Sequence, residues 1–306
     1  MIYKHLVVWP RLILGSVILD LFTYLNVSIN LINSFYMTNI KAKKRFGQNF
    51  LKDDSVLVEI IQSMPQNDNH IVEIGPGLGD LTKRLVKCKD VTAYEVDRDL
   101  YSILQKEFQK ELETNTLNII LGDVLEKWNQ NNSLYDNKYD MIANLPYYIA
   151  TNIILNAYDD IQCEHIIVMV QKEVADKFTA SCGDKEYSSL GVITQLISKE
   201  AKTIIVVPPE SFSPPPKVDS AVIYIKKDLN KTVSIGFKKF LRGCFVQPRK
   251  KLIKNLSAFY NKKLLSDIFT ELNISDNARP HEVDASLYSH IYTKVTNNGR
   301  EHNTSC

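Results

Sequence analysis

The chain has 306 residues, of which 44% are hydrophobic and 24% charged, with 11 glycines and 11 prolines. This balance is that of a globular protein large enough for two domains, and it excludes collagen, a wholly disordered chain and a multispan membrane protein. The formal net charge of +2 hides an acidic middle, because residues 53–227 carry 17 basic and 27 acidic residues, whereas residues 37–52 carry five basic and none acidic and residues 228–306 carry 13 and 7. Two basic ends around an acidic body favour a polyanionic partner.

The cysteines and histidines point away from disulfides and metals. The five cysteines include no C-x-x-C pair, and their number is odd. The six histidines never fall at the spacing of metal ligands. We therefore expect no metal site, no disulfide framework and a reducing compartment, the cytoplasm.

The first 36 residues differ from the rest. Residues 12–25 read LILGSVILDLFTYL, an apolar run that is too short for a membrane span and contains Asp20. It lacks the small-residue cleavage site of a signal peptide. A mitochondrial presequence is rich in arginine, and Arg11 is the only arginine here. We interpret residues 1–36 as an atypical extension upstream of a true start at Met37, and we expect no membrane association. A real anchor or targeting segment and a packed helix are the alternatives.

Strand-like and helix-like segments alternate between residues 53 and 200. Residues 54–63 have helical spacing, as do residues 81–86 and 100–112. Short β-rich runs lie between such segments, at residues 70–74, 91–96, 117–121, 139–143 and 165–170. This alternation predicts an α/β fold with a parallel sheet covered on both faces.

The pattern changes after residue 200. Two further β-rich runs, 203–207 and 220–225, enclose a proline-rich stretch and predict a hairpin-like end to the sheet. Beyond residue 228 the segments 237–260 and 263–272 read as amphipathic helices. We therefore predict a catalytic domain at 37–227 and a small all-helical domain at 228–306.

A glycine-rich turn follows the first buried strand. Gly75, Gly77 and Gly79 form a G-x-G-x-G pattern between that strand and a helix, where a ligand can approach the backbone closely. Glu95 ends the next strand and is placed to accept hydrogen bonds from ribose hydroxyls. Asp123 follows the third strand and is placed to accept from an adenine amine. Because open α/β sheets bind ligands at the carboxyl edge, these residues predict one binding site.

The loop and its acids resemble those of S-adenosylmethionine-dependent methyltransferases, whose cofactor is cationic at sulfur and has no phosphate. The resemblance implies a Rossmann-like methyltransferase sheet with S-adenosylmethionine bound at Gly75, Gly77, Glu95 and Asp123. It also explains why no phosphate-binding Arg or Lys stands beside the loop.

The fourth strand ends in Asn144-Leu145-Pro146-Tyr147. This motif resembles that of methyltransferases acting on exocyclic amino nitrogens, with Leu in place of the commoner Pro. The resemblance implies that the Asn144 side-chain oxygen and the Leu145 carbonyl accept from the target amine, that Pro146 holds the turn rigid and that Tyr147 stacks on the base. Two acceptors would localise the amine lone pair, so catalysis would be positioning and electrostatics without a strong general base. Asn144 would also contact the cofactor.

Two further segments narrow the resemblance to the small-subunit rRNA adenine N6-dimethyltransferases. Residues 44–51 read KRFGQNFL and match the K-x-x-G-Q-[NH]-F-L signature, which implies cofactor contacts from Asn49 and Leu51. Residues 209–220 read PESFSPPPKVDS and resemble F-x-P-x-P-K-V-x-S, which implies that Phe212 stacks on the base face opposite Tyr147.

The tail has a basic stretch, since residues 237–263 contain nine basic residues and no acid. Pro248 suits the first turn of a helix there, and the segment is similar to the family's Q-x-R-K-x-[IL]-x-x-L. We expect RNA phosphate contacts from seven basic residues of the two ends, Lys43, Lys44, Arg45, Arg249, Lys250, Lys251 and Lys254.

The resemblance implies a monomeric enzyme that dimethylates two adjacent adenosines near the 3′ end of 16S rRNA in the 30S precursor of the small ribosomal subunit. Three alternatives stay open at this point. They are a large-subunit rRNA methyltransferase that confers antibiotic resistance, a non-catalytic ribosome-assembly or transcription factor on the same scaffold, and a DNA amino-methyltransferase. The P-P-P-K-V-D-S form and the 270 residues from Met37 favour the first reading.

Overall fold

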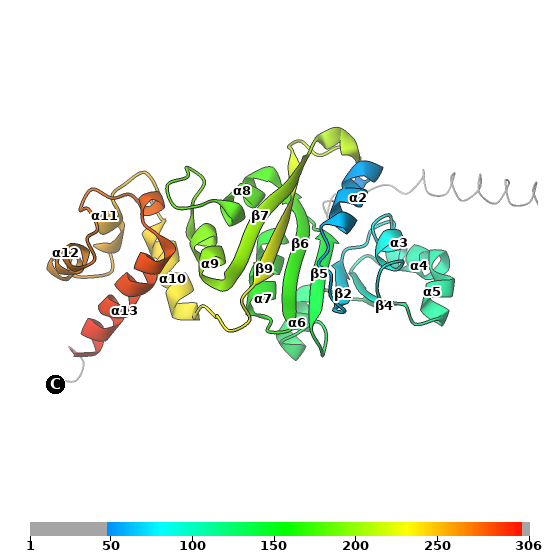
Figure 1. Ribbon diagram of the computed structural model, residues 1–306, viewed down its shortest axis with the longest axis horizontal. Helices are drawn as coiled ribbons and strands as arrows, with labels where there is room; N and C mark the ends of the chain where they lie inside the picture. Colours follow the sequence, from blue (N-terminus) through cyan, green and yellow to red (C-terminus); the bar gives the residue numbers. More distant parts are fainter. Residues whose placement is uncertain (1–47, 302–306) are drawn as a thin grey trace, which may run out of the picture. The chain divides into compact units, whose positions relative to one another are not determined.

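A computed structural model of the protein describes residues 48–301, which fall in one compact unit (Figure 1). The apolar extension, Met37 and the basic residues Lys43, Lys44 and Arg45 lie outside the described residues. Within the described range, no helix has the length and apolar character needed to cross a membrane.

Seven strands form one sheet in the order β4-β3-β2-β5-β6-β9-β7. Strands β2 to β6 run parallel, and β9 is antiparallel to both of its neighbours. The bounds of the strands are β2 His70–Ile74, β3 Val91–Glu95, β4 Leu117–Leu121, β5 Tyr139–Asn144, β6 Cys163–Gln171, β7 Ser198–Val207 and β9 Ser220–Lys227. The predicted parallel sheet and its hairpin-like end are confirmed, although β7 begins five residues earlier than the pattern of residues 203–207 indicated.

Helices connect the strands and cover both faces of the sheet. Their bounds are α2 Asp54–Gln62, α3 Thr82–Leu85, α4 Arg98–Glu107, α5 Gln109–Glu113, α6 Val124–Asn131, α7 Ala150–Asp159, α8 Lys172–Thr179 and α9 Ser189–Ile197. The predicted helix over residues 100–112 is two helices, because the chain breaks at Phe108, whose ring turns into the core and is 3% exposed.

Neighbouring residues of each buried strand serve two different cores, one on each face. In β2, Ile71 belongs to the apolar cluster that contains residues of α2, α3 and α4, whereas Val72 belongs to the cluster that contains residues of α6 to α9. Met141 and Ile142 of β5 divide in the same way. Side chains alternate across a strand, so a strand buried on both faces must be apolar at successive positions. This is why the sequence shows continuous apolar runs rather than alternation.

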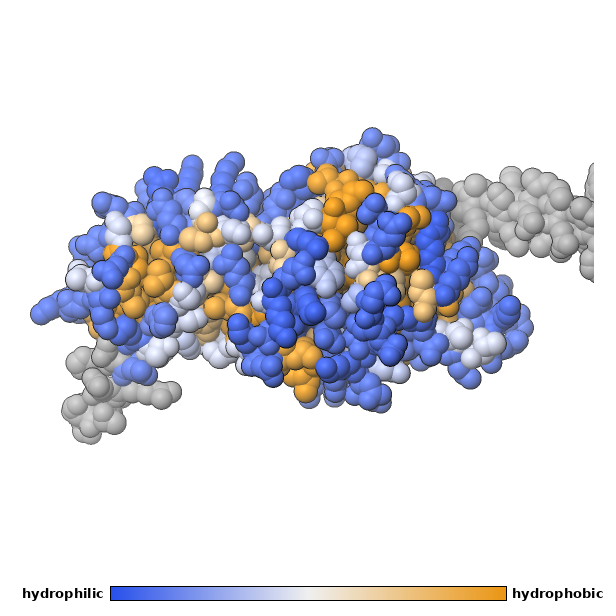
Figure 2. All heavy atoms as spheres, viewed as in Figure 1, coloured by the Kyte–Doolittle hydropathy of each residue, from blue (hydrophilic) through white to orange (hydrophobic). Residues whose placement is uncertain are grey.

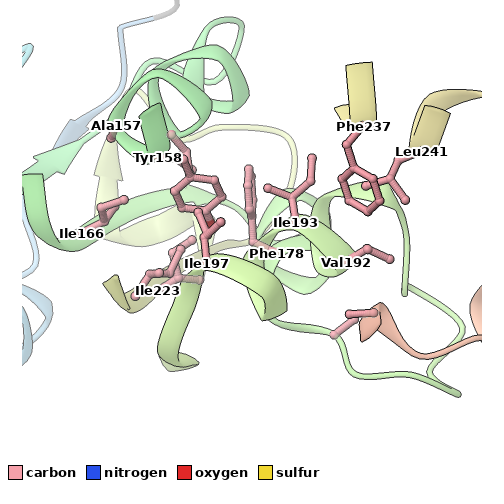
Figure 3. Packing of buried hydrophobic residues seen from close by; sticks show 14 of the residues in the cluster. Ala157, Tyr158, Ile166, Phe178, Val192, Ile193, Ile197, Ile223, Phe237 and Leu241 are labelled. Atoms are coloured by element: carbon pink, nitrogen blue, oxygen red, sulfur yellow. The ribbon is translucent and has the colours of Figure 1, made fainter. Parts of the chain in front are cut away.

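Every regular element after β9 is helical, as predicted. These elements are α10 Ile235–Cys244, α11 Leu252–Leu256, α12 Lys262–Glu271, a short 3-10 turn at Pro280–Glu282, and α13 Ala285–Glu301. The helices share a core with the sheet, since Phe237 and Leu241 of α10 belong to the same apolar cluster as Ile193 of α9 and Phe178 of α8 (Figure 3).

The predicted long helix over residues 237–260 is wrong. Helix α10 ends at Cys244, and α11 begins only at Leu252. Between them the Lys250 N–H donates to the Gln247 carbonyl at 2.9 Å, which places Pro248 at the second position of a tight turn. Proline favours this position because its ring presets φ, and it is therefore not in the first turn of a helix.

Candidate active site

The carboxyl ends of β2, β3, β4 and β5 open into one pocket of about 1060 Å³. The loops that follow these strands line it, and the segment 48–51 closes one side. The pocket contains all the predicted cofactor residues, which are Asn49, Leu51, Gly75, Gly77, Glu95, Asp123 and Asn144. It also contains Leu145, Pro146 and Tyr147, so five separate parts of the sequence converge here.

The glycine loop follows β2 with three left-handed residues. Gly75, Gly77 and Gly79 have φ of +67°, +62° and +85°, a region that side chains with a Cβ rarely adopt. The Phe50 ring lies against the loop, because a Cβ on Gly77 would stand 3.2 Å from its Cδ1. The loop therefore requires glycine both for its backbone conformation and for its contact with the 48–51 segment.

Glu95 ties the end of β3 to the glycine loop. Its carboxylate accepts from the Asp97 N–H at 2.8 Å and from the Gly77 N–H at 3.4 Å. Burial raises the pKa of this carboxyl above its ordinary value, although the two backbone hydrogen bonds act in the opposite direction. Since each carboxylate oxygen can accept more than one hydrogen bond, Glu95 retains capacity for ligand hydroxyls.

Asp123 has two roles in the structure. Its Oδ1 caps α6 by accepting from the Leu125 N–H at 2.8 Å. Its Oδ2 has no hydrogen-bond partner among the described residues, and the exposed side chain lines the pocket. A helix cap and a ligand acceptor are thus compatible in one residue.

The Asn144–Tyr147 turn is held from three sides. The Asn144 Nδ2 donates to the Asn49 carbonyl at 3.2 Å, and the Leu145 N–H donates to the Met169 carbonyl at 3.1 Å. Because the amide nitrogen of Asn144 is engaged, its oxygen remains as the acceptor for a ligand. The Tyr147 hydroxyl shares a 2.6 Å hydrogen bond with Ser220, which orients the ring from β9.

The segments 48–51 and 209–220 meet in a two-stranded antiparallel sheet, β1 (Phe50–Leu51) with β8 (Phe212–Ser213). The contact brings the two signatures together, but it does not bring Phe212 to the pocket. The Phe212 side chain is 4% exposed and packs with Leu51 in the core. The stacking of Phe212 on the base stays a prediction, and the described structure places this ring among core residues rather than along the pocket.

Further residues line the pocket that the sequence patterns did not assign to it, among them Tyr148 and Glu73. Tyr148 follows the motif directly and is 60% exposed at the pocket rim, where its only signal was a second aromatic after Tyr147. Glu73 precedes the glycine loop and is 1% exposed, with its carboxylate accepting from the Thr82 hydroxyl at 2.6 Å. Its signal was an acid within an otherwise apolar strand.

Burial raises the pKa of Glu73 to about 8, with a further contribution from nearby Glu95, so the folded protein holds this proton at neutral pH. An unfolded chain loses it near the ordinary value of 4.5. Its contribution to stability is therefore full below pH 4.5 and is lost as the pH rises through 8, by at most about 1.4 kcal/mol per pH unit.

We expect Glu73→Gln, which keeps a neutral side chain, to flatten the fall in the free energy of unfolding between pH 5 and 8. Urea titrations of both proteins across this range measure the difference in slope. Parallel slopes in the two proteins would show that Glu73 is ionised in the fold.

The lining residues fit a cationic cofactor without phosphate. Three carboxylates line the described pocket, those of Asp80, Glu95 and Asp123, together with the protonated carboxyl group of Glu73, and no Lys or Arg does. A dinucleotide would need donors for its pyrophosphate, whereas a sulfonium with an adenosine and an amino acid moiety suits acids, glycines and apolar walls.

The predicted phosphate-binding residues of the tail form a basic turn, which we define as residues 247–254. Arg249, Lys250 and Lys254 are exposed and form no ion pair among the described residues. Lys251 is also exposed, but its amine donates to Asn277. The buried Asn255 anchors the turn by donating to the Cys244 and Gln247 carbonyls.

The strand order, with its pocket of acids at the carboxyl edge, defines a Rossmann-like S-adenosylmethionine-dependent methyltransferase. Solved structures share this fold. A dimethyladenosine transferase from Plasmodium falciparum aligns with a TM-score of 0.70 at 24% identity, covering 82% of this chain and 98% of that one. The 23S rRNA methyltransferase ErmE aligns with a TM-score of 0.62 at 21% identity, covering 81% and 100%.

The chain belongs to the ribosomal RNA adenine dimethylase family, whose model matches residues 39–296. A ribosomal RNA small subunit methyltransferase A from Aliarcobacter butzleri is 63% identical over 261 residues, which cover 85% of this chain and 98% of that protein. The protein of the same name from Sulfurimonas denitrificans is 51% identical over 88% of this chain and 100% of its own. The resemblance predicted from the motifs is confirmed.

Proposed function

We propose that this protein transfers methyl groups from S-adenosylmethionine to the N6 amines of two adjacent adenosines near the 3′ end of small-subunit rRNA during ribosome assembly. The observation that carries the proposal is the pocket in which the oriented Asn144 amide meets the acid-lined cofactor site. The names of the relatives, which act on small-subunit rRNA, support the choice of substrate.

The cofactor supplies an electrophilic methyl group when bound. Glu95 and Asp123 would accept hydrogen bonds from its ribose and adenine, and the left-handed glycines would let it approach the backbone. Asn49 and Leu51 close the pocket from the side of β1. This arrangement orients the methyl group and excludes water around it.

The target amine lies between two acceptors of the Asn144–Tyr147 turn. The Asn144 oxygen and the Leu145 carbonyl accept hydrogen bonds from its two N–H groups, which restores lone-pair density to the nitrogen. Pro146 packs near Gly75, since a Cβ on Gly75 would stand 3.8 Å from the Pro146 ring. The closed proline ring restricts the backbone of the turn that carries the two acceptors. Tyr147, held by Ser220, offers a face for the extruded base.

We further propose that the protein acts in the cytoplasm as a monomer, docking on the 30S precursor through the basic turn. The four described cysteines form no disulfide, which suits a reducing compartment. The large exposed apolar residues of the described chain lie on separate elements, which supports a monomer. On the face that Figure 2 draws, the hydrophobic surface is divided into several patches.

Incubation of the enzyme with radiolabelled S-adenosylmethionine and undermethylated small subunits tests the substrate. We expect label in the N6-dimethyladenosines of small-subunit rRNA, and no label in large subunits or duplex DNA. Label confined to large subunits would replace this proposal by the resistance-type activity. No label in any substrate, with the cofactor bound, would favour a non-catalytic assembly factor.

A further inference from the structure

We propose that Phe259, on the helical part of the chain, is a stacking site for an unpaired rRNA base, separate from the methylation pocket. The inference rests on the proposed function for its class of ligand. Phe259 lies between α11 and α12 and is 64% exposed, whereas Phe240 of α10 and Phe269 of α12 are buried.

The ring of Phe259 packs against α10 at Gly243, a position without a side chain. A Cβ on Gly243 would lie 3.0 Å from Cε2 of this ring, so the absence of a side chain there gives the ring its place. The backbone is also set, because the Phe259 N–H donates to the Leu256 carbonyl at 2.9 Å. The ring is thus exposed and positioned at once, which a core residue or a loosely held surface residue is not.

The ring borders a pocket of about 490 Å³ beside α10. Gly236, Lys239 and Gly243 lie on the same face of this helix, because residues three to four apart are neighbours on a helix surface. The floor is apolar, formed by Phe240 and Leu256. A flat ligand can therefore contact the aromatic ring while its charged part stays near Lys239.

The charges around the pocket identify the ligand as a polyanion. No acidic residue occurs between residues 229 and 266. Lys239, Arg242, Lys262 and Lys263 are exposed and form no ion pair with any residue that the structure describes. Lys238, by contrast, is bound to Asp159 at 2.6 Å.

An aromatic face among unpaired cations is the arrangement by which proteins bind unpaired nucleotides, since bases stack on the ring while cations meet phosphates. An apolar protein surface would gain nothing from the cations. Figure 2 shows hydrophobic surface within a hydrophilic surround over these helices.

The test compares Phe259→Ala and Phe259→Tyr in binding to undermethylated small subunits and, at low ionic strength, to protein-free small-subunit rRNA. Ile161→Ala is the matched control, because Ile161 is an equally exposed apolar residue (67%) outside the basic region. Phe259→Ala should weaken binding to both RNAs by about 5- to 150-fold, the range for loss of one stacked base. Phe259→Tyr and Ile161→Ala should bind like the wild type.

The salt dependence separates stacking from charge. Phe259→Ala should keep the wild-type slope of log affinity against log salt, because no phosphate contact is lost, whereas Lys239→Gln should reduce it by about 0.7–0.9. Wild-type affinity in Phe259→Ala overturns the inference, as does a loss seen with intact subunits but absent with protein-free rRNA, which would mark a ribosomal protein as the partner.

The inference and the proposed function fail separately. If the wild type labels large subunits instead, the same variants are compared on large-subunit rRNA, and a loss confined to Phe259→Ala still supports the stacking site. Thermal melting of each variant checks the fold, which the exposed position of Phe259 should leave intact.

Discussion

Replacing Asn144 by Ala should reduce methyl transfer by about 10²–10³-fold, the usual cost of removing one preorganised hydrogen-bonding group from a reacting centre. Because the Asn144 amide nitrogen donates to the Asn49 carbonyl, the amide oxygen is the atom available as an acceptor. Alanine removes this oxygen. Cofactor affinity should change little, because Glu95, Asp123 and the glycine loop stay in place. Single-turnover kinetics with undermethylated small subunits and calorimetric cofactor titration measure the two effects.

Asn129→Ala is the matched control for this variant. Asn129 lies exposed on α6, outside the pocket, and its loss should leave turnover unchanged. The hydrogen bond to Asn49 contributes about 1 kcal/mol to stability, so the melting temperature of Asn144→Ala should fall only slightly. Turnover near that of the wild type in Asn144→Ala would contradict the role given to this side chain.

Neutralising the basic turn by Arg249→Gln, Lys250→Gln and Lys254→Gln together should weaken binding to small subunits by about 100-fold near 0.1 M salt. The three cations are exposed and have no ion-pair partner among the described residues, so each is available to a phosphate. The slope of log affinity against log salt should become shallower by about 2–3. Fluorescence titrations over a range of salt concentrations measure both quantities.

A second triple variant controls for net charge. Lys87→Gln, Lys106→Gln and Lys110→Gln remove the same charge from exposed positions near α3, α4 and α5. This variant should bind nearly as the wild type does. Equal losses in the two triple variants would show that overall charge, and not the basic turn, governs docking.

The strands and the glycine loop were predictable because their signals are local. Val72 and Ile71 face opposite cores, so the run around them is apolar at successive positions, and the next turn needs residues that tolerate a positive φ. The predicted convergence of Gly75, Glu95 and Asp123 follows from the geometry of parallel strands, whose carboxyl ends share one edge.

The errors arose where distant contacts overrode a local pattern. A helix over residues 237–260 satisfied the apolar spacing. However, the buried Asn255 donates hydrogen bonds to the carbonyls of Cys244 and Gln247 and so stabilises a turn after α10. The position of the Phe212 ring likewise depends on a distant contact, the pairing of its backbone with Leu51, and its stacking on a base stays a prediction.

The class of fold, the family and the main residues of the pocket were predictable without the structure, because each depends on short-range spacing or on a motif. The orientation of the Asn144 amide, the position of the Phe212 ring and the retained proton of Glu73 could be known only from the three-dimensional arrangement of the chain. Those properties depend on partners far apart in the chain, among them Asn49, whose carbonyl no pattern around residue 144 could reveal.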